Sequence, residues 1–105
     1  MKVLLSTTGR DLKAEIDPRF GRAERFVLVD TVTGEIQSVA NDEARDAQQG
    51  AGIKAAELAV KLGAKVVITG NCGPKAFRVL DAAGIEVYSG ASGTLAKALD
   101  DLKAG

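Results

Sequence analysis

The second half of the chain alternates between helical patterns and short apolar runs, and this alternation limits the folds open to it. Apolar residues recur at helical spacing over 55–62, 76–83 and 95–102, with the apolar runs 65–70 and 85–89 between them. Strands that are linked through helices in this way are parallel and have right-handed crossovers. The pattern therefore predicts a parallel α/β sheet in this half.

The first half contains three strand patterns followed by one polar stretch. The strand patterns cover 2–7, 25–30 and 35–39, and the glycine-containing turn between the second and the third is typical of a hairpin. The stretch 41–52 is polar and rich in turn-forming residues, so we expect a loop there. The predicted order of elements is β-β-β-α-β-α-β-α.

This order predicts one α/β domain over residues 1–105, since a chain of 105 residues leaves little room for a second core. Placing the fourth strand beside the first gives three α/β/α layers around a five-stranded mixed sheet of order 3-2-1-4-5, in which strand 2 is antiparallel. This is the connectivity of the ribonuclease H-like motif. Open α/β sheets bind ligands at the carboxyl ends of their parallel strands. Four loops share that edge: 9–24, 41–52, 70–73 and 89–93.

The composition excludes several classes of function. Lysine and arginine total 14, as do aspartate and glutamate, so no overall field attracts nucleic acid. Histidine is absent, which excludes histidine-based catalysis and histidine-ligated zinc. Two-metal nucleases need carboxylates at the strand ends, whereas the first strand ends in Ser6, Thr7 and Thr8. These absences remove many enzyme classes, and the sequence offers no catalytic residues of these kinds.

The chain also lacks the signals of membrane insertion and secretion. No apolar run approaches the roughly 20 residues of a membrane span, and the N-terminal apolar run is shorter than that of a secretory signal. The single cysteine cannot form an intramolecular disulfide. We expect a cytoplasmic protein that is a monomer or a weak homodimer, since Glu35 and Glu86 oppose pairing through an edge strand.

Glycines and cationic side chains gather in the loops of the predicted ligand edge. Eight of the twelve glycines lie there, where they let backbone amides approach a ligand or simply make turns. The helix starts near Gly73 and Gly93 suit an anion, because the first amides of a helix are free. The nearby cations either counter such an anion or are solvated charges paired with acidic residues. They are Arg10, Arg19, Arg22, Arg45 and Lys75.

Cys72 lies between glycines just before a predicted helix. A thiolate is stabilised at such a position and can attack or bind a metal, and the alternative is an inert buried cysteine. One thiolate cannot build a four-cysteine iron–sulfur site or a structural zinc site within one chain. Any metal must therefore arrive as a preformed anionic unit held by amides and arginines with at most one thiolate, or be shared between chains.

Two sequence runs resemble a known family. The run D-P-R-F-G-R-A-E-R-F at 17–26 is similar to the opening signature of the dinitrogenase iron-molybdenum cofactor-binding family, the NifX and NifB C-terminal type of domain. The run G-N-C-G-P-K-A at 70–76 continues the match, which covers essentially the whole chain. The resemblance implies a ribonuclease H-like fold. It also implies a non-catalytic binding, carrier or accessory role for an iron–molybdenum or other metal–sulfur cluster.

The resemblance and the loop positions together suggest a set of site residues. Relatives often carry histidine in the loop before the G-x-G segment, whereas this chain has D-A-Q-Q at 46–49. Cys72 is therefore the one expected metal ligand. The residues expected to bind the cofactor are Arg10, Arg19, Phe20, Gly21, Arg22, Gln49, Gly50, Asn71 and Gly73.

Three functions remain open on the sequence. The first is a carrier that binds the metal–sulfur cluster and meets a cofactor-assembly or acceptor protein. The second is a small regulatory or adaptor domain that binds a partner protein or an anionic metabolite at the same edge, with Cys72 structural. The third is thiol chemistry at Cys72, which lacks a resolving cysteine.

Overall fold

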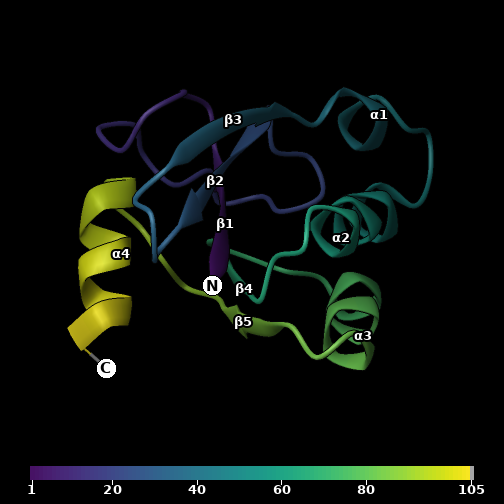
Figure 1. Cartoon of the computed structure of the whole chain (residues 1–105). Coiled ribbons are helices and arrows are strands. Elements are labelled where there is room, and N and C mark those ends of the chain that lie inside the picture. Colours follow the sequence, from purple (N-terminus) through teal and green to yellow (C-terminus); the bar gives the residue numbers. More distant parts are fainter. Residues whose placement is uncertain (105) are drawn as a thin grey trace.

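A computed structural model describes residues 1–104, and within them the chain forms five strands and four helices (Figure 1). In chain order they are β1 (Lys2–Thr7), β2 (Arg25–Asp30), β3 (Ile36–Ala40), α1 (Asp42–Arg45), α2 (Ala51–Lys61), β4 (Val66–Ile68), α3 (Pro74–Ala82), β5 (Glu86–Tyr88) and α4 (Leu95–Ala104).

The five strands form one mixed sheet in the order β3-β2-β1-β4-β5. β2 pairs antiparallel with β1 and β3, while β1, β4 and β5 are parallel. Val3 in the central strand lies opposite Val29 on one side and Val66 on the other. The predicted strand order and the single antiparallel strand are confirmed.

Helices cover both faces of the sheet, as the alternating β and α pattern requires. Figure 1 shows α2 and α3 on one side and α4 on the other. Successive side chains of β1 alternate between the two layers: Leu4 packs toward α2 and α3, and Val3 and Leu5 pack toward α4. The core is largely aliphatic, and one aromatic pair, Phe20 and Phe26, contributes to the layer on the α2 and α3 side with ring centroids 5.4 Å apart.

The prediction of a loop over 41–52 was wrong at both ends of this range. Residues 42–45 form the short helix α1, and α2 begins at Ala51. A helix of four residues is too short to show an apolar period, although Asp42 and Glu43 suit its first turn and Ala44 is buried. Gly50 allows the early start of α2, because it adopts a left-handed conformation with φ of 73°.

Candidate functional site

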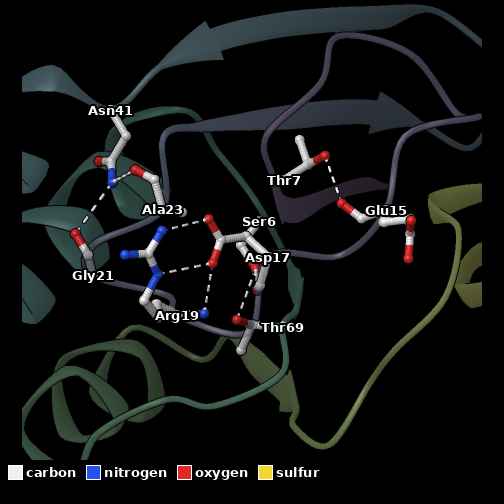
Figure 2. A network of polar contacts seen from close by, with 9 residues as sticks. All are labelled: Ser6, Thr7, Glu15, Asp17, Arg19, Gly21, Ala23, Asn41 and Thr69. Atoms are coloured by element: carbon white, nitrogen blue, oxygen red, sulfur yellow. Dashed lines mark hydrogen bonds and ion pairs between the residues drawn. The ribbon is translucent and has the colours of Figure 1, made fainter.

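A buried hydrogen-bond network joins the ends of β1 and β4 to the loop that follows β1. The amide of Asp17 donates to the carbonyl oxygen of Ser6 at 2.8 Å. The Ser6 hydroxyl lies 2.7 Å from the carbonyl oxygen of Asp17, to which it donates, and 2.8 Å from Thr69 Oγ1 (Figure 2). All three residues are buried. The network therefore fixes the loop over the carboxyl edge of the sheet.

Asp17 orients Arg19 at the surface. Its carboxylate accepts hydrogen bonds from the Arg19 backbone amide at 2.9 Å, from Nε at 3.2 Å and from Nη2 at 3.3 Å. The Asp17 side chain is 1% exposed, while that of Arg19 is 64% exposed. The hydrogen bond and the charge of Asp17 raise the pKa of Arg19 above its usual value. Arg19 is therefore a fixed cation whose Nη1 makes no hydrogen bond within residues 1–104.

Two close backbone contacts bring this loop against neighbouring elements. A Cβ atom on Gly70 would lie 2.5 Å from Pro18 Cα, and one on Gly21 would lie 2.7 Å from the amide nitrogen of Gly52. The amide of Phe20 also donates to the carbonyl oxygen of Asn71 at 3.1 Å. Glycine is required at Gly21 and Gly70 because a side chain has no room there. The loop thus lies between the start of α2 and the turn before α3.

The N-termini of α2 and α3 lie at this same edge. Their N-cap residues are Gly50 and Gly73, neither helix has a side-chain cap, and neither has an acidic residue in its first turn. A Cβ atom on Gly52 would lie 3.2 Å from Ala76 Cβ, so the first turns of the two helices are in contact. α3 follows β4, and α2 follows β3 after the short helix α1, so both helices have their positive ends here. The arrangement favours a bound anion.

Arg22 is hydrogen bonded to main-chain oxygens. Its Nη1 donates to the carbonyl oxygen of Arg45 at 2.7 Å and to that of Ala47 at 2.6 Å, beyond the end of α1. Arg10 lies in the part of the 8–16 loop that packs with the start of α4, since Ala96 donates to the carbonyl oxygen of Leu12 in that loop. The structure therefore separates Arg10 from the first turns of α2 and α3.

The other predicted site residues also lie at this edge, and they differ in how far they are exposed to solvent. Gln49, Gly50, Asn71 and Gly73 are exposed in the loops that lead into α2 and α3. Phe20 is 1% exposed and belongs to the core, so its backbone amide is the part of it that faces Asn71.

Cys72 is half-buried and packs against the core layer of α2 and α3. Its Sγ lies 3.7 Å from the carbonyl oxygen of Gly73, to which the thiol donates. Partial burial raises the pKa of the Cys72 thiol. This direction is opposite to the stabilised thiolate that a position before a helix suggests. It argues against thiol chemistry and favours a protonated cysteine at neutral pH.

We expect Cys72 to react slowly with iodoacetamide at pH 7, because only the thiolate attacks. The rate should keep rising beyond pH 8.5, the approximate pKa of a peptide cysteine. Alkylation rates measured from pH 6 to pH 10, with a short cysteine peptide as the control, test this. A rate that levels off below about pH 8 would contradict the raised pKa.

Sequence reasoning missed Asn41 and the buried network. The Asn41 side chain donates from Nδ2 to the carbonyl oxygens of Gly21 at 3.2 Å and Ala23 at 2.9 Å (Figure 2). Its Oδ1 is buried without a hydrogen-bond partner within the described residues. The available signal was weak: an asparagine after a strand resembles any polar loop residue. Similarly, Asp17 is one of the acidic residues that the solvated-charge alternative pairs with the cations, and its burial could not be predicted because it depends on the fold.

The described residues show neither a multi-ligand metal site nor a membrane span. No group of three or more histidine, cysteine, aspartate or glutamate side chains within residues 1–104 is placed to hold a metal ion. None of the helices in that part of the chain is long and apolar enough to cross a bilayer.

The strand order and the glycine-rich edge define a small α/β domain of the ribonuclease H-like type. Residues 1–105 match the family model described as dinitrogenase iron-molybdenum cofactor. The chain belongs to this family.

Among the solved structures that are similar over nearly the whole chain, two share more than a third of its residues. The apo form of the orange protein from Desulfovibrio gigas is 40% identical, with 99% of this chain and 88% of that chain covered and a TM-score of 0.96. A NifB-like protein from Thermotoga is 36% identical with the same coverage and a TM-score of 0.84.

One curated relative matches part of the chain. The uncharacterized protein MJ0580 of Methanocaldococcus jannaschii is 37% identical over 75 residues, which are 70% of this chain. The match spans 64% of that relative, less than two thirds of its length.

Proposed function

We propose that this protein binds and carries an anionic metal–sulfur cluster, without catalysing a reaction on it, at the edge formed by the first turns of α2 and α3. The observation that carries the proposal is the contact between two helix N-termini that lack side-chain caps and first-turn acids, beside the fixed cation Arg19. The chain's family, whose model is described as dinitrogenase iron-molybdenum cofactor, supports a metal–sulfur cluster as the bound anion.

The donors present suit a preformed anion. Free amides at Gly21, Gly50 and Gly73, with Arg19, would hold it through hydrogen bonds and charge, and the side chains of Gln49 and Asn71 would add polar contacts. A fixed charge near a helix N-terminus contributes roughly 0.3–1 kcal/mol, so several such contacts are needed for tight binding. We assign no direct contact to Arg10, because its loop packs with the start of α4.

Cys72 is the soft donor of this edge. A bound metal removes the proton of a coordinating thiol, which offsets the raised pKa of Cys72. A free thiol is also compatible with a reducing cytoplasm, where we place the carrier. The cargo would pass to a cofactor-assembly or acceptor protein.

The experiment is anaerobic reconstitution with iron, sulfide and tetrathiomolybdate, followed by desalting, metal analysis and a visible spectrum. We expect wild-type protein to retain the cluster, and Arg19→Gln to weaken retention roughly tenfold or more, because a charge-assisted hydrogen bond is lost. The matched control is Lys65→Gln, which removes one exposed positive charge at the opposite edge of the sheet. Equal retention by both variants would contradict the role of Arg19.

Cys72→Ala separates two forms of the proposal. Loss of retention identifies Cys72 as a metal ligand, and full retention leaves amides and Arg19 as the whole site. Failure of wild-type protein to retain any metal–sulfur species would contradict the carrier function.

A second candidate is a regulatory or adaptor domain that binds an anionic metabolite or a partner protein at the same edge. The packing of Cys72 against the core favours it, because a structural cysteine needs no metal. It predicts that inorganic phosphate or a phosphate-bearing metabolite protects the amides before α2 and α3 from hydrogen exchange. Cys72→Ala would leave that protection unchanged.

A further inference from the structure

Arg22 joins two loops that are far apart in sequence. Its Nη1 lies 2.7 Å from the carbonyl oxygen of Arg45 and 2.6 Å from that of Ala47. A helix leaves its last carbonyl groups without partners, and Arg45 ends α1. Both hydrogens on this nitrogen are therefore used, and the charge of the guanidinium strengthens both bonds.

The segment 21–23 is anchored on either side of α1 and at the start of α2. Asn41, just before α1, donates to the carbonyl oxygens of Gly21 and Ala23. Gly21 contacts the backbone of Gly52 in the first turn of α2, where a Cβ atom would lie 2.7 Å from nitrogen. The stretch between Ala47 and Gly52, which carries Gln49 and Gly50, is thus held at its beginning by Arg22 and at its end by Gly21.

We propose that Arg22 is a positioning residue that fastens this stretch and so presents the free amides at the start of α2. The proposal rests on the proposed function and deepens it: Arg19 contacts the anion, and Arg22 acts through the backbone. Gly50 requires this support because its left-handed conformation is one of many open to glycine. Without Arg22 the stretch samples other conformations, and a ligand must select the ordered one.

The loss of affinity for the anion depends on the fraction of molecules in which the stretch between Ala47 and Gly52 is ordered. Apparent affinity falls in proportion to the population that can bind, so a stretch ordered about one-tenth of the time binds about tenfold more weakly. The same loss of order exposes amides that are hydrogen bonded in this region. The amide of Asp46 donates to Asp42, that of Ala47 to Ala44, and that of Lys54 to Gly50.

Hydrogen exchange on the ligand-free protein tests the positioning directly. We expect Arg22→Met, which keeps most of the stem and removes the donors, to speed exchange at the amides of Asp46, Ala47 and Lys54 about tenfold. Exchange in β1 and β4 should stay unchanged. Arg22→Lys, whose ammonium has three donors, should restore most of the protection. Arg78→Met, at an exposed position of α3, is the matched control. Unchanged exchange in Arg22→Met would overturn the proposal.

Salt dependence distinguishes positioning from direct contact. We expect Arg22→Met to weaken tetrathiomolybdate binding about tenfold while leaving its dependence on salt concentration little changed, whereas Arg19→Gln reduces that dependence. A reduced salt dependence in Arg22→Met equal to that of Arg19→Gln would show that Arg22 contacts the anion, and would overturn the positioning role. If wild-type protein binds no anion, the proposed function fails, and the exchange experiment still decides whether Arg22 orders the stretch.

Discussion

Replacing Asn41 by aspartate is expected to lower the free energy of unfolding by about 4 kcal/mol at pH 7. Asn41 is 1% exposed, and its Nδ2 donates to the carbonyl oxygens of Gly21 and Ala23. A carboxylate in its place would turn an oxygen toward two carbonyl oxygens and would be buried without a donor. Burial of this kind raises a carboxyl pKa by about 3 units, and each unit is worth about 1.4 kcal/mol.

The pH dependence of this cost has a definite sign. The new carboxyl has a folded-state pKa above its unfolded value of about 3.9, so the protonated form favours folding. The destabilisation is therefore smallest below about pH 4 and grows as the pH rises toward the folded pKa. A residual cost remains at low pH, because a protonated carboxyl has one donor where the amide has two.

Urea unfolding of wild type and variant at pH 4 and pH 7 measures this effect. The matched control is Asn71→Asp, the same chemical change at an exposed position, which should alter stability little at either pH. An equal loss for Asn41→Asp at both pH values would show that lost hydrogen bonds, and not a buried charge, cause the destabilisation. A stability equal to that of Asn71→Asp would contradict the structural role of Asn41.

Gly70→Ala is expected to destabilise the protein by about 2–3 kcal/mol, since overpacking of a well-packed site costs about that much. The added methyl group would lie 2.5 Å from Pro18 Cα, 3.0 Å from its Cβ and 3.1 Å from its carbonyl oxygen. The backbone of one loop must move to make room. The same movement should break the hydrogen bond from the Phe20 amide to the Asn71 carbonyl oxygen.

Urea unfolding and hydrogen exchange at the Phe20 amide measure the two consequences. Gly73→Ala is the matched control three positions further along the same turn, because a Cβ atom there meets nothing within 4 Å. It should cost less than about 1 kcal/mol, the usual scale for an N-cap change. If the two alanine variants were equally stable, the contact between Gly70 and Pro18 would not constrain the fold.

The sheet could be predicted from the sequence because its signals are local and repeated. The helical patterns that end near Gly63 and Gly84 and the apolar runs after them define parallel connections, and connection handedness then leaves few strand orders. The helix α1 could not be predicted in the same way. Four residues carry no period, and its one buried side chain, Ala44, is explained by packing that the sequence does not display.

The candidate site could be predicted in position but not in the roles of its residues. Loop placement brought Arg19 and Arg22 to one edge, yet the sequence does not distinguish a side chain fixed by Asp17 from one bound to main-chain oxygens. Phe20 looked available to a ligand and is buried against Phe26. For Cys72 the sequence left a stabilised thiolate and an inert buried cysteine open, and only the fold shows the partial burial that raises the pKa of its thiol. The role of each of these side chains depends on contacts between segments that are distant in sequence.

The hairpin turn between β2 and β3 offers a place to attach the protein to a surface. It lies at the end of the sheet opposite the four ligand-edge loops, because β2 runs antiparallel to β1. Val32 in this turn is 83% exposed. A cysteine-free linker or affinity handle inserted at Val32 would orient every immobilised molecule with the starts of α2 and α3 toward the solution. A sensor surface that carries the protein in this orientation could report ligand binding without covering the ligand edge.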